Sequence, residues 1–166
     1  SIAAFPGMDE KTIILDGFSK SYAMTGWRLG YGIFPPELVP HIVRLASNSV
    51  SCTATFSQWA AIAALDGPQD NVQARLAEFT QRRRLIVDGL RSIPGINCPD
   101  PEGAFYVFPN ISGTGLSSAE FEDRAMNDAG VALLPGNDFG EFGEGYVRLS
   151  YANSQENISK AVEKLD

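Results

Sequence analysis

The sequence has few of the residues that metal-binding and disulfide-rich proteins need. Only two cysteines, Cys52 and Cys98, and one histidine, His41, occur among the 166 residues. They form no CxxC pair and no His/Cys spacing typical of zinc sites. Neither a disulfide framework nor a metal site is therefore expected, and the cytoplasm is the expected location.

Excess positive charge and long apolar runs are missing as well. The chain has 13 Lys and Arg against 20 Asp and Glu, a net charge of -7, whereas nucleic-acid binding needs clustered, unbalanced basic residues. The basic run 82–84 lies in a helical pattern beside Glu78 and Asp88, which favours a solvated helix face over a phosphate patch. No run approaches the roughly 18 apolar residues of a membrane span, and residues 1–7 do not resemble a signal peptide. The sequence predicts no nucleic-acid partner and no membrane partner.

The apolar patterns that are present predict an α/β first half and a small α+β second half. A long helical pattern over 72–93 ends at Pro94-Gly95 and separates the two. The expected domains are therefore residues 1–67, a connecting helix over 68–95, and residues 96–166. Strands are expected at 12–15 (of the buried, parallel kind), 29–34, 104–108, 131–134 and 146–151. The other expected helices are 37–45, 56–65, one opened by a capping box at Ser117 and Glu120, and one beginning near residue 153.

The first half lacks enough elements to bury its own sheet. Two short strands and two helices cannot cover both faces of a parallel sheet. The missing strands are expected to come from an upstream segment or from another chain.

The most informative stretch is residues 16–31, DGFSKSYAMTGWRLGY. Lys20 lies in a loop of small and hydroxyl residues between two expected strands, and Arg28 follows eight residues later. An amine can form an imine with an aldehyde cofactor, and a planar guanidinium can bind a phosphate bidentately. By spacing alone, a surface loop with a solvated lysine and a salt-bridged arginine would explain the same residues.

Residues Gly17 to Gly30 resemble the pyridoxal-phosphate (PLP) attachment signature of class I and II aminotransferases. The signature has a small residue before the lysine and then a Gly-x-Arg-apolar-Gly segment. The resemblance implies a PLP-dependent transferase of fold type I, of the aspartate/aromatic type, with Lys20 as the Schiff-base lysine and Arg28 on the phosphate. Many relatives have serine where Gly17 stands. Ser19 is expected to supply the hydroxyl instead, the alternative being a local turn hydrogen bond.

The resemblance continues through residues 101–106, 134–140 and 145–151, and so covers the whole chain. It implies the C-terminal portion of such an enzyme: residues 1–67 are the end of the large, PLP-binding domain and 96–166 the small C-terminal α+β domain. Arg148 matches the arginine that binds the substrate α-carboxylate. An arginine inside an apolar strand also needs an anion on physical grounds. The alternative is a structural ion pair with an acid such as Glu144.

The implied activity is transfer of an amino group between an amino acid and a 2-oxo acid through Lys20, in a homodimer of the full-length protein. A PLP-dependent lyase of the same fold, or a non-catalytic PLP-binding effector domain of a regulator, remains an alternative. The family's pyridine-nitrogen partner and its stacking ring lie upstream of Lys20. Residues 1–166 alone are therefore expected to show no turnover.

Overall fold

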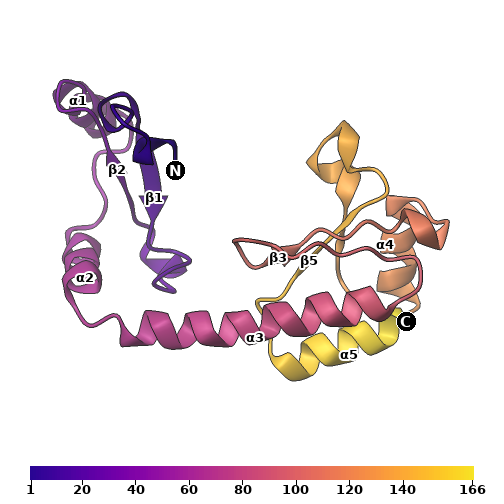
Figure 1. Cartoon of the computed structure of the whole chain (residues 1–166). Helices are drawn as coiled ribbons and strands as arrows, with labels where there is room; N and C mark the ends of the chain where they lie inside the picture. The colour runs from indigo at the N-terminus through magenta and orange to yellow at the C-terminus, as the bar shows by residue number, and fades with distance from the viewer. The chain divides into compact units, whose positions relative to one another are not determined.

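The computed structural model describes all 166 residues, which form two compact units (Figure 1). Unit 1 comprises Ser1–Val72 and unit 2 comprises Gln73–Asp166. The division falls close to the start of a long helix, α3, which spans Asp70–Ser92. Each unit is described below by itself.

Unit 1 contains a β-hairpin made of β1 (Ile14–Gly17) and β2 (Gly30–Ile33). The strands are antiparallel, with Ile14 opposite Ile33 and Gly17 opposite Gly30. Both strands were expected, but the parallel type expected for the first is wrong within this chain. The connection contains no helix long enough to carry the chain back across a sheet, so β2 returns directly alongside β1.

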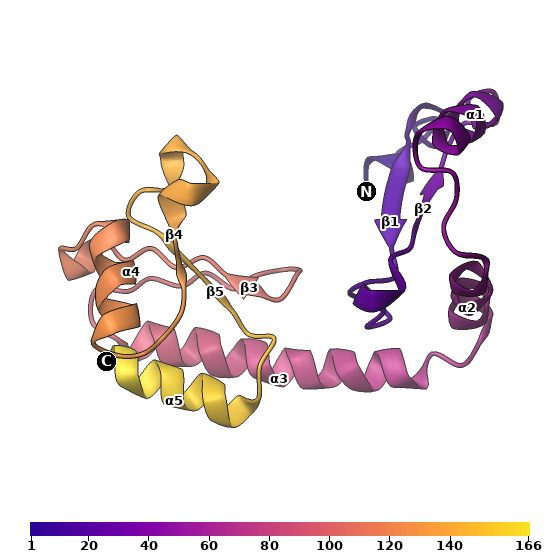
Figure 2. The same ribbon diagram turned by 180° about the vertical axis from the view of Figure 1, so that it is seen from behind.

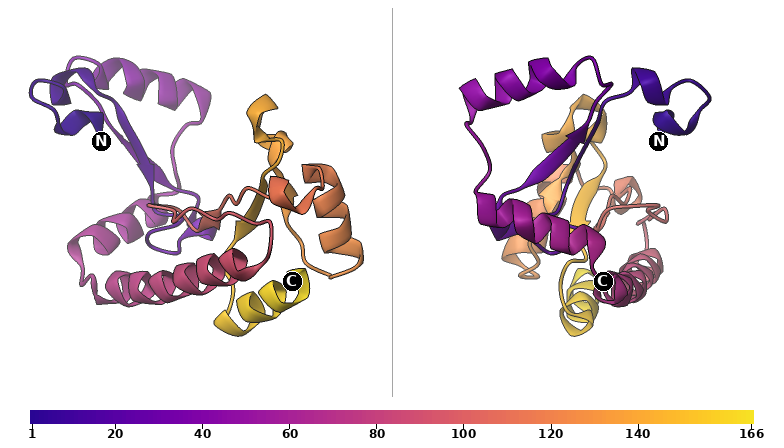
Figure 3. Two further views of the ribbon diagram at one scale, coloured as in Figure 1. Left: turned by 45° about the vertical axis from the view of Figure 1, so that its right-hand side comes forward. Right: turned by 90° about the vertical axis from the view of Figure 1, so that its left-hand side faces the viewer.

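Two helices complete unit 1, α1 (Val39–Ser49) and α2 (Thr55–Asp66). Figure 3 shows α1 near one end of the hairpin and α2 near the other, where the loop between the strands lies. The loop residues Phe18 and Met24 are buried together with Ala61 of α2. This small cluster fixes the loop on the helix.

Most of the large apolar side chains of unit 1 are exposed. The exposed fraction is 74% for Leu15 on β1, 55% for Ile33 on β2 and 70% for Phe56 on α2. Apolar surface exposed on this scale is rare on a protein that has no partner for it. Within this chain, nothing in unit 1 covers it.

Unit 2 is built on α3 and on the last helix, α5 (Gln155–Leu165). Figures 1 and 2 show α5 running alongside the C-terminal half of α3, with the strands of unit 2 above both. The approach is close at Gly89, where an added Cβ would lie 2.8 Å from Cγ1 of Val162. The end of α3 at Ser92, just before Pro94-Gly95, confirms the predicted helix stop.

The sheet of unit 2 has three short antiparallel strands in the order β3-β5-β4. They are β3 (Tyr106–Val107), β4 (Leu134–Pro135) and β5 (Val147–Ser150). The predictions for β3 and β4 were too long, and residues 131–133 are not a strand. The amide of Val131 donates to the Ala125 carbonyl at the end of a helix, and Val131 and Leu133 are buried. Residues 131–133 therefore form the connection between the end of this helix and β4.

The helix in question is α4 (Ser118–Asn127), which begins at the predicted capping box. The Ser117 hydroxyl accepts from the Glu120 amide at 3.3 Å, and the Ser117 amide donates to the Glu120 carboxylate at 3.0 Å. The Ser117 hydroxyl also donates to the Glu120 carboxylate at 2.6 Å, and this hydrogen bond, followed by the one from the Ser117 amide, lowers the pKa of Glu120. The box satisfies two backbone donors that would otherwise lack partners.

One core holds unit 2 together, formed by α3, α4, α5 and the sheet. Its centre includes Leu90 and Val87 of α3, each 1% exposed, and each such side chain contributes about 1.5–3 kcal/mol on burial. Cys98 is fully buried, and this desolvation raises the pKa of its thiol to about 11. It is a structural residue.

Charged residues outside the core are paired along α3. Arg82 forms an ion pair with Glu78 at 2.8 Å, and Arg83 donates to the Pro101 carbonyl at 3.0 Å. These contacts confirm the interpretation of the basic run as a helix face. The structure contains no group of three or more His, Cys, Asp or Glu residues that could hold a metal ion. None of its helices has the length and apolarity that crossing a membrane requires.

Candidate active site

The loop between β1 and β2 carries Lys20, and a buried aromatic side chain holds it. Phe18 is 2% exposed, and its carbonyl accepts from the amides of Tyr22 at 3.2 Å and Met24 at 3.3 Å. The Lys20 carbonyl accepts from the Ala23 amide at 3.2 Å, which closes a tight turn. The turn keeps Lys20 at the exposed surface of the loop.

Ser19, next to Lys20, is half-buried in the same turn. Its hydroxyl forms no local turn hydrogen bond, so the alternative explanation for Ser19 does not apply. Nearby, the Tyr31 hydroxyl donates to the Asp16 carboxylate at 3.3 Å. Desolvation, followed by the charge of Asp16, raises the pKa of Tyr31.

Arg28 ends the same loop in a conformation that arginine seldom adopts. Its φ is 53° and its ψ is 52°, in the left-handed region, and Ala23 also has a positive φ of 55°. Non-glycine residues in this region persist where the surrounding structure holds them, often at ligand sites. The guanidinium Nη1 donates to the Thr25 carbonyl at 2.8 Å, and no carboxylate pairs with Arg28. The salt-bridge alternative for Arg28 is therefore wrong.

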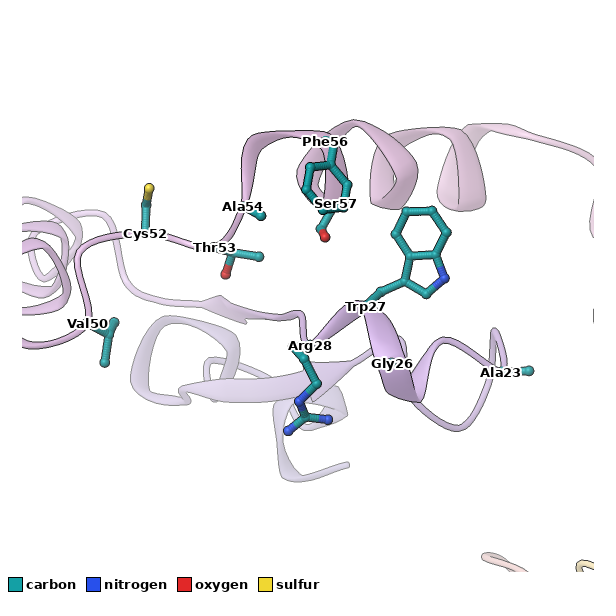
Figure 4. Close-up of a pocket in the computed structure, with 10 residues that line it drawn as sticks. All are labelled: Ala23, Gly26, Trp27, Arg28, Val50, Cys52, Thr53, Ala54, Phe56 and Ser57. Atoms are coloured by element: carbon teal, nitrogen blue, oxygen red, sulfur yellow. The ribbon is translucent and has the colours of Figure 1, made fainter.

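A pocket of about 760 Å³ lies beside Arg28 in unit 1. Its walls come from the segment Gly26–Arg28 and from residues 50–57, which lead into α2 (Figure 4). The Trp27 indole points toward Phe56, with ring centroids 6.3 Å apart, whereas the Arg28 guanidinium points away from α2. Neither Lys20 nor Ser19 lines this pocket. Of the predicted cofactor residues, the pocket includes only Arg28.

Two hydroxyl residues of the pocket, Thr53 and Ser57, were not predicted. Figure 4 shows both hydroxyl oxygens on the side of α2 that faces Gly26–Arg28. Ser57 is 2% exposed. In the sequence, Thr53 belongs to the polar stretch between two expected helices and Ser57 to the first turn of the second one, and nothing in their spacing marks either as a site residue.

Arg148, the fourth predicted site residue, lies in unit 2 on the central strand β5. Its guanidinium carbon is 4.4 Å from the ring centroid of Tyr106 and 4.4 Å from that of Phe139. Neither an ion pair nor a hydrogen bond to a carboxylate involves Arg148. The Glu144 carboxylate instead accepts from the Ser118 amide at 2.9 Å, so the alternative of an Arg148–Glu144 ion pair is wrong.

The two rings that contact Arg148 were missed in the sequence, although both lie in segments that the resemblance includes. Tyr106 is on β3, and Phe139 ends a 3-10 turn at Gly136–Phe139 that follows β4. Alternation along strands shows which face a residue occupies, but it does not show which neighbouring strand it meets. Only the strand order β3-β5-β4 brings both rings to Arg148.

The turn that carries Phe139 depends on Gly136, and we predict that Gly136→Ala destabilises unit 2. Gly136 is buried against Gly143, and an added Cβ would overlap the Gly143 carbonyl and lie 2.7 Å from the Tyr146 oxygen. Backbone that cannot move aside makes such overpacking cost about 1–3 kcal/mol. Chemical denaturation monitored by circular dichroism measures the decrease in the free energy of unfolding.

Gly103→Ala is the matched control for Gly136→Ala. Gly103 belongs to the same unit, and an added Cβ there would have no atom within 4 Å. Its free energy of unfolding should stay within about 0.5 kcal/mol of the parent value. Equal stabilities of the two variants would contradict the packing explanation.

Comparison with known proteins agrees with these features. The family described as aminotransferase class I and II matches residues 2–165. The aspartate aminotransferase of Pyrococcus horikoshii is 42% identical over 95% of this chain, and the aromatic-amino-acid aminotransferase 2 of Thermococcus litoralis is 42% identical over all of it. The chain spans 41% and 43% of these two relatives, in their C-terminal part.

Solved structures give the same result. The aromatic aminotransferase of Pyrococcus horikoshii superimposes with a TM-score of 0.93 at 41% identity, over 99% of this chain and 44% of that one. The aspartate aminotransferase of Rhizobium meliloti gives a TM-score of 0.89 at 38% identity, over 97% of this chain and 42% of that one. The fold is the C-terminal portion of a fold type I PLP-dependent transferase. The chain belongs to the class I and II aminotransferase family.

Proposed function

We propose that this chain is part of a PLP-dependent aminotransferase that moves an amino group between an amino acid and a 2-oxo acid. The observation that carries the proposal is the single loop between β1 and β2, which presents Lys20 and an arginine without a carboxylate partner, Arg28. Family membership supplies the reaction class. Because the chain spans less than half of its relatives, the activity is a proposal for the complete protein.

The residues of the loop fit PLP in their chemistry. Lys20 would hold the cofactor as a Schiff base, because it is an exposed residue of the turn and carries the primary amine that imine formation requires. Arg28 would bind the phosphate, because its guanidinium is exposed, lacks a competing carboxylate and is steadied by the Thr25 carbonyl. Ser19, whose hydroxyl forms no local hydrogen bond, would add a donor. When bound, PLP supplies the electron sink that makes the substrate Cα–H bond acidic.

The lysine has a second proposed task, proton transfer. When it is not bonded to the cofactor, the Lys20 Nζ would accept the proton from the substrate Cα and deliver it to the C4′ atom of the cofactor. Its attachment to a turn fixed by Phe18 limits where the amine can reach. A proton acceptor held within hydrogen-bond reach of the reacting atom typically accelerates transfer about 10²–10⁴-fold.

Arg148 would bind the α-carboxylate that every amino acid and 2-oxo acid substrate carries. Arg148 stands on β5 between apolar residues, its guanidinium contacts two aromatic rings and has no internal anion, so a bound carboxylate would satisfy it. Both substrate classes share this group, which is why one arginine serves both halves of the reaction.

We predict that Arg28→Ala weakens PLP retention about ten- to over a hundredfold. Loss of a charge-assisted contact costs roughly 1.5–3 kcal/mol, which corresponds to that range. Equilibrium dialysis of the complete protein, with PLP followed by absorbance, measures the change. Arg44→Ala is the control, because Arg44 is an exposed arginine on α1 of the same unit. An unchanged PLP affinity in Arg28→Ala would contradict the phosphate assignment.

The reaction class itself is tested by product analysis. The complete protein, loaded with PLP and given one amino acid without an acceptor, should form one equivalent of the 2-oxo acid per site. A lyase would release ammonia and continue to turn over, and an effector domain would form no product. Either of those outcomes would contradict the aminotransferase proposal.

Three further properties belong to the proposal. Residues 1–67 would be the end of the large domain, and residues outside this chain would cover the exposed apolar surface of unit 1. The complete protein would be a homodimer, and it would work in the cytoplasm. Residues 68–95 would form the connecting helix, and residues 96–166 would form the small domain.

A further inference from the structure

Two aromatic rings contact the Arg148 guanidinium from the two sides of its strand. Tyr106 is on β3 and Phe139 follows β4, and β5 lies between these strands in the sheet. The guanidinium carbon is 4.4 Å from each ring centroid. This distance is well within the range of about 6 Å at which a cation is attracted to a ring face.

The Phe139 ring is itself held in place by other aromatic side chains. Phe108 meets it edge-to-face, with centroids 5.9 Å apart and planes at 85°. Phe108 also stacks on Tyr146, with ring centroids 5.4 Å apart and planes at 8°. Because aromatic pairs favour these two geometries, the chain of rings fixes the surface against which Arg148 lies.

Ring contacts of this kind leave the hydrogen-bonding capacity of arginine unused. The five N–H donors of a guanidinium lie in its plane, whereas a ring packs on its face. None of these donors has a carboxylate partner in the structure, and Arg148 is half-buried. The rings therefore restrain the group without competing for the ligand.

We propose that Phe139 and Tyr106 are positioning residues that orient the Arg148 guanidinium for a planar carboxylate. The inference rests on the proposed role of Arg148 toward the substrate. The rings exclude water from the guanidinium faces and reduce the number of rotamers that a ligand must select. Both effects favour carboxylate binding without any contact between the rings and the carboxylate oxygens.

Nuclear magnetic resonance of the complete protein, labelled with ¹⁵N-arginine, tests the inference directly. The Arg148 Nε–Hε signal, identified by its loss in Arg148→Lys, should be shifted upfield by the ring currents. Phe139→Leu should reduce that shift, and it should raise the dissociation constant of acetate, used as the carboxylate probe, about three- to tenfold. Phe139→Trp, which restores a ring face, should restore both values.

The control is Phe142→Leu, the same substitution three residues along the chain. Phe142 is 90% exposed and makes no ring contact with Arg148, so acetate binding and the Arg148 signal should not change. Tyr106→Leu provides a second ring deletion from the opposite strand. It should weaken acetate binding and reduce the shift of the Arg148 signal in the same way. If neither Phe139→Leu nor Tyr106→Leu weakens acetate binding, the inference is overturned.

A double variant separates this inference from the proposed function. If Arg148→Lys does not weaken acetate binding, the carboxylate role of Arg148 fails. If Arg148→Lys weakens it but Phe139→Leu does not, only the positioning role fails. Phe139→Leu should add little in the Arg148→Lys background, because the ring acts through the planar guanidinium. An equal effect in both backgrounds would mean that Phe139 acts on the fold alone, and would overturn the positioning role.

Discussion

Replacing Lys20 by arginine is expected to abolish attachment of PLP and to lower the transamination rate of the complete protein at least about a thousandfold. Arginine keeps the positive charge and the length, but it is not deprotonated in proteins and cannot form the imine or accept a proton. Borohydride reduction of the parent protein, followed by digestion and mass spectrometry, should place the cofactor on the peptide that contains Lys20.

Lys11→Arg serves as the matched control for Lys20→Arg. Lys11 ends the 3-10 turn Asp9–Lys11, in the same unit and also at the surface. This variant should retain PLP and full activity. Reduced cofactor found on the Lys11 peptide instead would show that the attachment site has been misassigned.

Removing the guanidinium at Arg148 is expected to produce the second large effect. Deleting one partner of a buried charge pair typically costs about 2–5 kcal/mol. Arg148→Leu should therefore lower kcat/KM by about thirtyfold to a few thousandfold. Arg148→Lys should lie between the parent and Arg148→Leu, because lysine keeps the charge but loses the planar fork. Steady-state kinetics with a range of amino acid concentrations measures both.

The cofactor provides the internal check on Arg148. PLP absorbance and affinity should be unchanged in both variants, because the proposed contact is with the substrate. Arg84→Lys, an exposed arginine on α3, should alter neither kinetics nor PLP binding. Loss of PLP from Arg148→Lys, or unfolding of unit 2, would show that Arg148 does not act on the α-carboxylate.

Several elements follow from local sequence and were predicted correctly. The capping box at Ser117 and Glu120 starts α4, and Pro94-Gly95 follows the end of α3, because both signals act through backbone groups a few residues apart. The hairpin strands and β5 were also found within a few residues. Family membership was predicted from the loop that carries Lys20, since a long match of residue types is a local property.

Other features depend on contacts that local patterns do not contain. Val131 and Leu133 have apolar character typical of a strand, but the Val131 amide bonds to the end of α4. β1 was expected to be of a parallel type, and within this chain it pairs antiparallel with β2. In both cases the partner of the backbone, rather than the residue type, decides the structure.

The sequence by itself determined the reaction class that the chain points to and the residues proposed to carry it, Lys20, Arg28 and Arg148. These follow from the resemblance of short segments to the motifs of the aminotransferase family. Only the tertiary structure decided the surroundings of those residues. It left Arg28 without a carboxylate, directed Glu144 to a helix amide, and placed Tyr106 and Phe139 against Arg148. The physical reason is that these contacts join residues of different elements, and the order and pairing of strands, which local sequence does not contain, bring those elements together.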